Sequence, residues 1–446
     1  MKTYYFLGIG GIGMSAIARY FNEMGNKIYG YDRTQTELTL QLEKEGMIIT
    51  YTDDASSLPK DIDMVVYTPA IPKESSILYN LKKRNIPIQK RSQILGEITK
   101  DKKCIAIAGT HGKTTCSNMI AHILHSSSVG CSAFLGGISK NFNSNYLMNK
   151  NSEYVVVEAD EYDRSFLWLN PTISAITAVD ADHLDVYGTK EELKESFIEF
   201  AKKTKEVIFV KDKIDIDLEE LDLQKYTYTI RGIDADFYAI NIRNYKGSYY
   251  FDLRTPDKIY YDICLNYGGL HNIENSVLAI AISLICGAKE DEIRKAISSF
   301  SGAQRRFDLR IKRDSFIYID DYAHHPNEIK ALVESLRHQY PNKKLTGVFQ
   351  PHLYSRTRDF ADEFAQELEK LDQVVLIDIY PAREEPIAGV NSKMLLHKID
   401  KMDKYYTTKE GLLDLLEALY PEVLVTMGAG DISNIVPLIE EKFRDE

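Results

Sequence analysis

Three times along the chain, an apolar run typical of a β-strand leads into a turn and then into a helical pattern. These runs open the segments YYFLGIGGIG, KKCIAIAGTHGKTT and FIYIDDYAHHPNEI. Alternating strands and helices predict an α/β fold with mostly parallel sheets. The length of 446 residues, at roughly 150 residues per domain, also gives about three units. We expect the first unit to end between Arg91 and Asp101 and the second near Arg306.

Short apolar runs predict strands in the first and third units, and a tyrosine-rich stretch stands out in the second. Residues 226–265 alternate in the manner of antiparallel strands, so we expect a meander appended to the second unit. The charge-rich segment 211–225 is expected to be a surface loop, and Ser276–Cys286 a helix. The other strands are expected at Tyr4–Leu7, Lys27–Tyr31, Met64–Tyr67, Leu345–Phe349, Gln373–Asp378 and Val423–Met427.

The composition is that of an acidic globular chain. Lys and Arg total 55 against 66 Asp and Glu, a net charge of −11, so a surface that coats nucleic acid is not expected. The five cysteines are scattered without a C-x-x-C pair, which favours a reducing cytoplasm over a disulfide framework or a zinc ribbon. No apolar run approaches the ~20 residues of a membrane span, so no membrane partner is expected.

The segment from Gly8 to Gly13 matches the pattern G-x-G-x-x-G between an expected strand and an expected helix. Glycines let the backbone turn tightly against a diphosphate, to which the helix presents its N-terminus. Asp32 ends the next strand, where a dinucleotide site has its ribose-binding carboxylate. The pattern selects a diphosphate, so NAD and a nucleotide sugar both fit it. A turn that only packs helix on strand also fits it.

The most informative single motif follows Cys104–Ala108 and reads GTHGKTT. It resembles a P-loop with a shortened spacing, in which backbone N–H groups surround the ATP phosphates, Lys113 reaches the β/γ oxygens and the Thr114 hydroxyl joins Mg²⁺. ATP and Mg²⁺ are therefore the expected ligands, and the alternative is a glycine turn beside a chance lysine. The expected ATP-binding residues are Gly109, Thr110, His111, Gly112, Lys113, Thr114 and Thr115.

Two later strands end in acidic residues, at the edge where α/β sheets bind ligands. The run YVVVEADE brings Glu158 to this edge. Burying carboxylates is costly without a cation, so Mg²⁺ is the expected partner of Glu158. The strand Ile173–Val179 leads into DADHLD, in which His183 is a candidate ligand of a second Mg²⁺. A solvated acidic loop and a structural histidine are the alternatives.

Further polar clusters lie late in the second unit and after the strands of the third. Asn272 in GGLHNIEN suits an adenine edge or a ribose, although for this segment taken alone helix capping is the stronger explanation. Arg305 and Arg306 in FSGAQRRF suit the charge of a transferring phosphate, or lie in a surface linker. The segments DDYAHHPNE, FQPHLYSRTR, DIYPARE and MGAGDI together describe one ligand-facing edge of a sheet.

In this order, these motifs are similar to those of the Mur ligase family of peptidoglycan synthesis. The resemblance extends over residues 8–432, and DDYAHHPNE with FQPHLYSRT is its most specific part. It implies a Rossmann-like domain for a UDP-sugar over 1–98, a central P-loop ATPase-like domain over 99–307, and a Rossmann-like α/β domain over 308–446 that closes on the site. The matching segments are GIGGIGMSAIA, AGTHGKTT, EADEYDRSFL, DADHLDVYGT, GGLHNIENS, FSGAQRRFD, DDYAHHPNE, FQPHLYSRTRDF, DIYPAREEPIAGV and MGAGDI.

The resemblance also implies roles for the residues that match the family's motifs. Catalytic roles fall to Lys113, His183, Arg305 and Arg306, and metal ligation to Thr114, Glu158 and His183. Nucleotide contacts fall to Asn272 and Asp321 in addition to the P-loop. Substrate contacts fall to Gly10, Gly11, Ile12 and Gly13 for the UDP diphosphate, and to Tyr322, His324, Arg356 and Arg358 for the amino acid and the sugar nucleotide.

The activity implied by the resemblance is ATP-dependent amide-bond formation between UDP-N-acetylmuramate and L-alanine through an acyl phosphate. We expect a cytoplasmic enzyme that is a monomer or a weak homodimer. Sister ligases use a carbamylated lysine, and the matching neighbourhood around Ile198 has no aligned lysine, which favours the alanine-adding branch. The alternatives are a recycling ligase that attaches a tripeptide to the same sugar nucleotide, an NAD-dependent oxidoreductase, and a non-catalytic ATP-binding switch.

Overall fold

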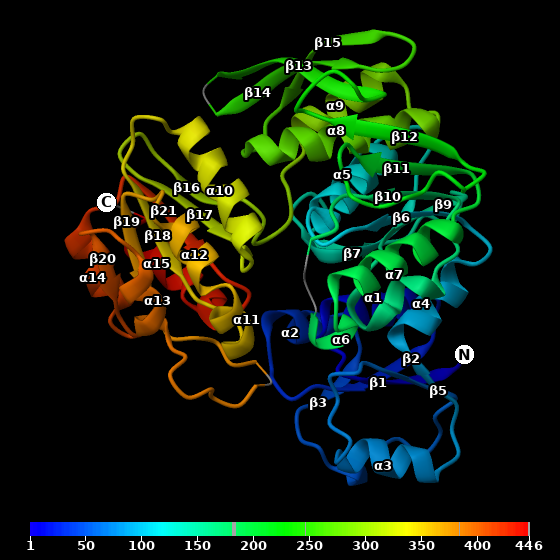
Figure 1. Cartoon of the computed structure of the whole chain (residues 1–446). Coiled ribbons are helices and arrows are strands. Elements are labelled where there is room, and N and C mark those ends of the chain that lie inside the picture. The colour runs from blue at the N-terminus through cyan, green and yellow to red at the C-terminus, as the bar shows by residue number, and fades with distance from the viewer. Residues whose placement is uncertain (181–183, 246, 383, 445–446) are drawn as a thin grey trace. The chain divides into compact units, whose positions relative to one another are not determined.

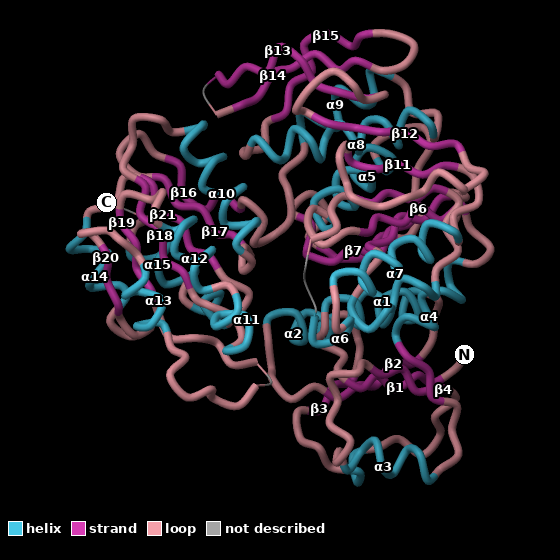
Figure 2. Tube along the Cα trace, in the orientation of Figure 1, coloured by secondary structure: helices cyan, strands magenta, loops and turns pink. Residues whose placement is uncertain are grey.

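The computed structural model describes residues 1–180, 184–245, 247–382 and 384–444. These residues form three β-sheets with helices beside each, which can be followed in Figures 1 and 2. The described residues divide into two compact units. Unit 1 comprises residues 1–241, 251–264 and 274–301, and unit 2 comprises residues 242–250, 265–273 and 302–446. The α/β fold with mostly parallel sheets, predicted from the alternation of strands and helices, is confirmed.

The first sheet is parallel, with the strand order β3-β2-β1-β4-β5. Helices α1 and α4 lie on one face and α3 on the other (Figure 1). Tyr5 and Phe6, neighbours in β1, are accordingly buried in two different cores, one on each face. The elements are β1 (Thr3–Leu7), α1 (Ile12–Glu23), β2 (Lys27–Tyr31), α2 (Glu37–Lys44), β3 (Ile48–Thr50), β4 (Met64–Tyr67), α3 (Ser76–Lys83), β5 (Ile88–Lys90) and α4 (Arg91–Thr99).

The second sheet has the order β15-β14-β13-β12-β11-β10-β6-β9-β7-β8. Strand β6 reads KCIAIA and is buried from Cys104 to Ala108, as a parallel strand covered on both faces must be. Its first elements are β6 (Lys103–Ala108), α5 (Lys113–His125), β7 (Ser132–Ser139), β8 (Ser144–Leu147), β9 (Tyr154–Glu158), the 3₁₀ segment η2 (Tyr162–Trp168) and β10 (Ile173–Ile176). The later ones are α6 (Leu184–Tyr187), α7 (Lys190–Lys202), β11 (Val207–Lys211), β12 (Gln224–Thr229), β13 (Phe237–Tyr245), β14 (Ser248–Arg254), β15 (Ile259–Leu265), α8 (Leu270–Ile285) and α9 (Glu290–Ser299).

The third sheet has the order β16-β17-β21-β18-β19-β20, with only the β16–β17 pair antiparallel. Asp321 and Phe349, the last residues of β17 and β18, both lie beside Met427, the last residue of β21. The loops after these strands therefore leave from one edge. The elements are β16 (Asp308–Lys312), β17 (Ile317–Asp321), α10 (Pro326–Gln339), β18 (Leu345–Phe349), α11 (Tyr354–Asp359), α12 (Ala361–Leu368), β19 (Gln373–Leu376), α13 (Ser392–Lys398), β20 (Lys404–Tyr406), α14 (Leu412–Leu419), β21 (Val423–Met427) and α15 (Val436–Lys442).

Two expectations about local structure were wrong. The tyrosine-rich stretch was predicted to be antiparallel throughout, but β12 pairs in parallel with β11 and with the start of β13. Alternating side chains are common to exposed strands of either direction, so the pattern carries no information about pairing. The helix expected at Ser276 begins at Leu270 instead, directly after Gly269, whose φ of +95° allows the turn that precedes it.

Within unit 1, α1 is fixed to the second sheet by buried polar contacts. Asn145 of β8 is fully buried and donates to the Ile12 carbonyl (2.5 Å) and to the Ser15 hydroxyl (2.9 Å). Arg19, 8% exposed, donates to the Asn145 side-chain oxygen and pairs with Glu45 at 2.8 Å. Because α1 follows the N-terminal glycine turn directly, these contacts set the position of that turn relative to the second sheet.

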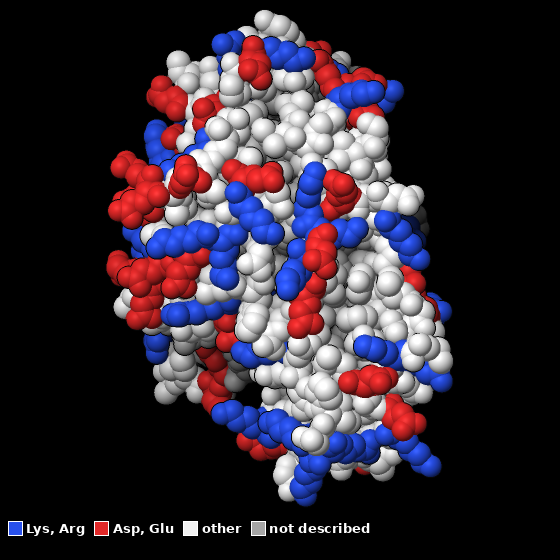
Figure 3. All heavy atoms as spheres, turned by 90° about the vertical axis from the view of Figure 1, so that its right-hand side faces the viewer, with Lys and Arg blue, Asp and Glu red and all other residues white. Residues whose placement is uncertain are grey.

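One face of the surface is shown in Figure 3, where acidic and basic side chains are interspersed and basic ones gather along the lower margin. A protein that coats nucleic acid needs a broad basic surface, which this face does not offer. Among the helices that the structure describes, none is long and apolar enough to cross a membrane.

Candidate active site

The N-terminal glycine turn is closed by its own hydrogen bonds. Gly8 has a φ of +83°, and the Gly11 N–H donates to the Gly8 carbonyl at 3.1 Å. The Gly10 N–H donates to the Asp32 carboxylate at 2.8 Å. Asp32, considered above as a ribose ligand, thus binds the turn itself. Helix α1 starts at Ile12 with neither a side-chain cap nor an acidic residue in its first turn, so its positive end suits an anion.

The loop from Gly109 to Gly112 joins β6 to α5 and depends on both glycines. Gly109 has a φ of +129°, and a Cβ there would lie 2.2 Å from the Thr177 hydroxyl. Gly112 has a φ of +85° and precedes α5 directly. The Thr110 N–H donates to the Ala178 carbonyl at 3.0 Å, which ties the loop to the end of β10. The predicted strand–loop–helix context of the P-loop motif is confirmed.

Lys113, the first residue of α5, is held by two acceptors. Its Nζ donates to the Gly109 carbonyl at 2.6 Å and to Glu161 Oε1 at 2.8 Å. The Glu161 side chain is 1% exposed. Burial by itself would lower the pKa of Lys113, but the charges of Glu161 and Glu158 outweigh it and raise the pKa above its ordinary value. Lys113 is therefore a fixed cation. Sequence reasoning missed Glu161, although it stands in the acidic run singled out above.

The oxygen donors proposed for Mg²⁺ fit that ion. Thr114 is 5% exposed in α5, and Glu158 ends β9. A Cβ on Gly136 of the adjacent strand β7 would lie 2.1 Å from the Glu158 carboxylate, so this side chain occupies space that only glycine leaves. The described residues contain no cluster of three or more His, Cys, Asp or Glu arranged for a metal. Mg²⁺ needs few protein ligands when phosphates and waters complete its shell.

Two histidines were predicted near this site, His111 and His183, and the described residues include only the first. His111 Nε2 lies 3.1 Å from Asp180 Oδ2, and the Asp180 N–H donates to the Thr110 hydroxyl at 3.1 Å. The P-loop is thus linked to the segment after β10. His183, predicted as a ligand of a second Mg²⁺, lies outside the described residues. Thr115 is 7% exposed within α5.

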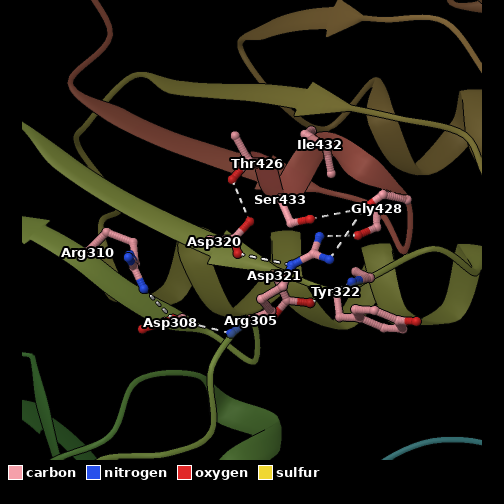
Figure 4. Close-up of polar contacts among 12 residues, drawn as sticks. Arg305, Asp308, Arg310, Asp320, Asp321, Tyr322, Thr426, Gly428, Ile432 and Ser433 are labelled. Carbon is pink, nitrogen blue, oxygen red and sulfur yellow. Dashed lines mark hydrogen bonds and ion pairs between the residues drawn. The ribbon is translucent and has the colours of Figure 1, made fainter. Parts of the chain in front are cut away.

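In unit 2, Arg305 is bound by a strand and a loop of the third sheet (Figure 4). Its Nε donates to Asp320 at 3.2 Å and its Nη2 to the Gly428 carbonyl at 2.5 Å. Asp320 is 2% exposed and also accepts from the Thr426 hydroxyl at 2.7 Å. These contacts give Arg305 a structural role at the edge where the polar motifs gather.

Arg306 shares the Tyr322 ring with Arg305 but lies near a different carboxylate, that of Glu328. Its guanidinium carbon lies 4.9 Å from the centre of the Tyr322 ring, and its Nη1 lies 3.8 Å from Glu328. Asp321 accepts hydrogen bonds from the N–H groups of Phe307 (2.6 Å) and Ala323 (2.8 Å). Burial raises the pKa of Asp321 to about 6, against the opposing charge of Arg306.

The remaining predicted residues also lie in unit 2. Asn272 is 1% exposed, lies in the first turn of α8 and donates to the Gly268 carbonyl at 2.6 Å, whereas a helix cap would accept from a backbone N–H. His324 Nδ1 lies 2.9 Å from the Tyr322 carbonyl and 3.2 Å from Glu328. Arg356 and Arg358 lie in α11, where Arg358 pairs with the exposed Asp359. The glycine turn and P-loop thus belong to unit 1, and the arginines, Tyr322, His324, Asn272 and Asp321 belong to unit 2.

Three family models match consecutive parts of the chain. They are the Mur ligase family, catalytic domain, at residues 3–103, the Mur ligase middle domain at residues 107–283, and the Mur ligase, glutamate ligase domain, at residues 305–430. A UDP-N-acetylmuramate--L-alanine ligase of Christiangramia forsetii is 46% identical over 454 residues, covering 100% of this chain and 98% of that protein.

Solved structures are also similar over the whole chain. A crystal structure of the UDP-N-acetylmuramate-alanine ligase of Thermotoga maritima has a TM-score of 0.86 at 27% identity and covers 100% of this chain and 99% of that one. A murein peptide ligase of Psychrobacter arcticus has a TM-score of 0.73 at 20% identity, with the same coverage of both chains. The second likeness concerns the fold alone.

Proposed function

This chain belongs to the Mur ligase family, and from that premise we propose that it is the alanine-adding ligase. It joins L-alanine to the lactyl carboxylate of UDP-N-acetylmuramate at the expense of ATP, in the synthesis of peptidoglycan precursors. The observation that carries this conclusion is the 46% identity, along 100% of this chain, to an enzyme of that name.

The reaction must turn a carboxylate, a poor electrophile, into an acylating agent. A lactyl carboxylate oxygen attacks the γ-phosphorus of ATP, the bond to the β-γ bridging oxygen breaks, and ADP leaves with that electron pair. The neutral amine of L-alanine then attacks the acyl carbon of the acyl phosphate. The tetrahedral intermediate collapses to an amide, phosphate leaves with the C–O electron pair, and the amine nitrogen loses its proton. Both steps concentrate negative charge on phosphoryl oxygens.

The residues of this chain suit that charge. Lys113 is a buried cation at the first turn of α5, where it would stabilise the β- and γ-phosphate oxygens. Thr114 and Glu158 would hold Mg²⁺, which when bound supplies further neutralisation of phosphoryl charge. The guanidinium of Arg305 binds Asp320 and the loop at Gly428, whereas that of Arg306 lies 3.8 Å from Glu328. We therefore assign the phosphate contact to Arg306, whose ion pair is the longer one.

Several finer features belong to the same proposal. The three domains would divide near residues 98 and 307, and the third would close on the other two once all substrates are bound. Tyr322, His324, Arg356 and Arg358 would contact the amino acid and sugar nucleotide, and His183 would bind a second Mg²⁺. The enzyme would act in the cytoplasm, where ATP is available, as a monomer or weak homodimer.

The test measures phosphate release from ATP with UDP-N-acetylmuramate and, in parallel, L-alanine, glycine, L-serine and the tripeptide L-alanyl-γ-D-glutamyl-meso-diaminopimelate. Release that requires both the sugar nucleotide and L-alanine, with a product of the matching mass, is the expected result. Release only with the tripeptide would assign the chain to the recycling branch. Nucleotide hydrolysis that no amine accelerates would contradict the ligase assignment.

A further inference from the structure

One short acidic segment of unit 1, Glu158–Asp163, pairs with Lys113 of the P-loop and with two cations where β5 meets α4. Glu161 binds Lys113 of the P-loop at 2.8 Å. Asp160 binds Arg91, the first residue of α4, at 3.0 Å, and Asp163 binds the preceding Lys90 at 2.8 Å. Asp163 has a φ of +53° and Arg164 a φ of +54°, values that cost energy for residues other than glycine. The three ion pairs thus hold this segment where its backbone turns into an unfavourable conformation.

Arg91 lies directly against the N-terminal glycine turn. A Cβ added to Gly13 would lie 2.9 Å from Arg91 Nη1 and 3.3 Å from Arg91 Cζ, so the guanidinium occupies the space that this glycine leaves open. The Arg91 side chain is 18% exposed, and Nη2 is its donor to Asp160. One edge of the guanidinium therefore faces the turn and the other faces the acidic segment.

We infer that Arg91 is a binding residue for the diphosphate of the sugar nucleotide, and that Asp160 is the positioning residue that aims it at the glycine turn. This inference rests on the proposed function, which supplies the UDP-sugar. A planar guanidinium can bind a carboxylate on one edge and phosphate oxygens on the other. The next residue, Glu161, is the partner of Lys113. The same segment would therefore position Arg91 for the sugar nucleotide and Lys113 for ATP.

The competing explanation is that the Arg91–Asp160 pair only fastens the first sheet to the second. The two explanations differ for the Asp160 variant. If the pair is a fastener, then Arg91→Gln and Asp160→Asn remove the same contact and weaken substrate binding equally. If Arg91 binds the diphosphate and Asp160 positions it, Arg91→Gln loses the ligand contact itself, whereas Asp160→Asn keeps the cation and an amide oxygen that still accepts from it, so its loss of affinity is smaller.

The experiment is isothermal titration of the full-length wild type and four variants with UDP-N-acetylmuramate and, separately, with UDP. We expect Arg91→Gln to raise Kd for both ligands about 10-fold or more, as loss of a charge-assisted contact does. Arg91→Lys is expected to be intermediate, and Asp160→Asn to raise Kd by clearly less than Arg91→Gln does. Lys90→Gln is the matched control, because it removes the adjacent pair, and its Kd is expected within about twofold of wild type.

An unchanged Kd in Arg91→Gln would overturn the inference, and so would equal losses in Arg91→Gln and Asp160→Asn. Titration of the same variants with ATP gives the second readout, in which Kd should stay at the wild-type value. If Arg91→Gln fails to fold, the Kd of Arg91→Lys for UDP becomes the test. An unchanged Kd in that variant would show that the planar guanidinium of Arg91 does not bind the diphosphate. Failure of the proposed function is distinguishable, because it is read from phosphate release by the wild type with L-alanine, whereas this inference is read from the ratio of the variant Kd to the wild-type Kd.

Discussion

Lys113 in unit 1 and Arg305 in unit 2 are both cations paired with a nearly inaccessible carboxylate, yet their surroundings differ. Lys113 follows a glycine loop at the first turn of a helix and has one backbone acceptor, the Gly109 carbonyl. Arg305 divides its donors between Asp320 and the Gly428–Gly430 loop. The first arrangement suits the binding of an anionic ligand, and the second uses a cation to shape a loop. A basic residue in a nucleotide-binding motif is therefore not by itself evidence of phosphate contact.

The largest effect is expected when Lys113 is replaced, which tests whether this cation acts on a ligand. Lys113→Met should lower kcat by about 10³-fold or more, because no other cation replaces the amine at the phosphoryl oxygens. Phosphate release under saturating substrates measures it. Lys103→Met is the control, since Lys103 begins β6, the strand before the P-loop, and pairs with the exposed Glu153. A Lys113→Met enzyme with a tenth of the wild-type kcat would refute the role.

The second test concerns Arg305 and Arg306, which the comparison separates. Arg305→Ala should lower the free energy of unfolding by about 3 kcal/mol, because Asp320 is left as an unpaired buried carboxylate. Arg306→Ala should lower stability by less than Arg305→Ala does, because its ion pair with Glu328 is longer, at 3.8 Å, and it should lower kcat. Urea unfolding and steady-state kinetics of both variants decide this. Adding Asp320→Asn to Arg305→Ala should recover part of the lost stability, and the reverse pattern in the two variants would invalidate the assignment.

The third test uses the buried Asp321. Its pKa is raised from 3.8 to about 6 in the folded protein, so the folded state binds more protons than the unfolded state between these values. The stability that the protonated form contributes is complete below pH 3.8 and is lost as the pH rises through 6. Relative to Asp321→Asn, the wild type should lose up to about 3 kcal/mol across this window. Parallel urea midpoints of the two proteins from pH 4 to 7 that keep a constant difference would contradict it.

The smallest effect is expected for Arg358, whose pair with Asp359 is more than half exposed on both side chains. Arg358→Ala should shift Tm by less than about 1 °C, since exposed ion pairs contribute little. If Arg358 contacts substrate as proposed, KM for the sugar nucleotide or L-alanine should rise while Tm stays constant. A clear loss of Tm would instead place Arg358 with Arg305 among the structural cations.

Local patterns predicted much of the fold because strand and loop signals are short-range. The strands β2, β4, β18 and β21 begin and end at the predicted residues. The direction of β12 was not predictable, because pairing depends on a partner remote in the sequence. The roles of Glu161 and Arg91 were missed for the same reason, since they arise from side chains 48 and 69 positions from their partners. For Asn272, sequence left ligand contact and capping open, and its bond to the Gly268 carbonyl ties α8 to the preceding turn without capping it.

The contacts of Asn145 with α1 carry a consequence for how such a chain can be recombined. A hybrid that takes its first 98 residues from one relative and the remainder from another would join the two parts in a well-placed connection after α4. It would nevertheless separate Arg19 and the Ile12 carbonyl from the asparagine that binds both. We expect exchange at this point to succeed only when the first part carries an arginine equivalent to Arg19 and the second an asparagine equivalent to Asn145. The first two sheets should therefore be exchanged together, although each has its own strand order.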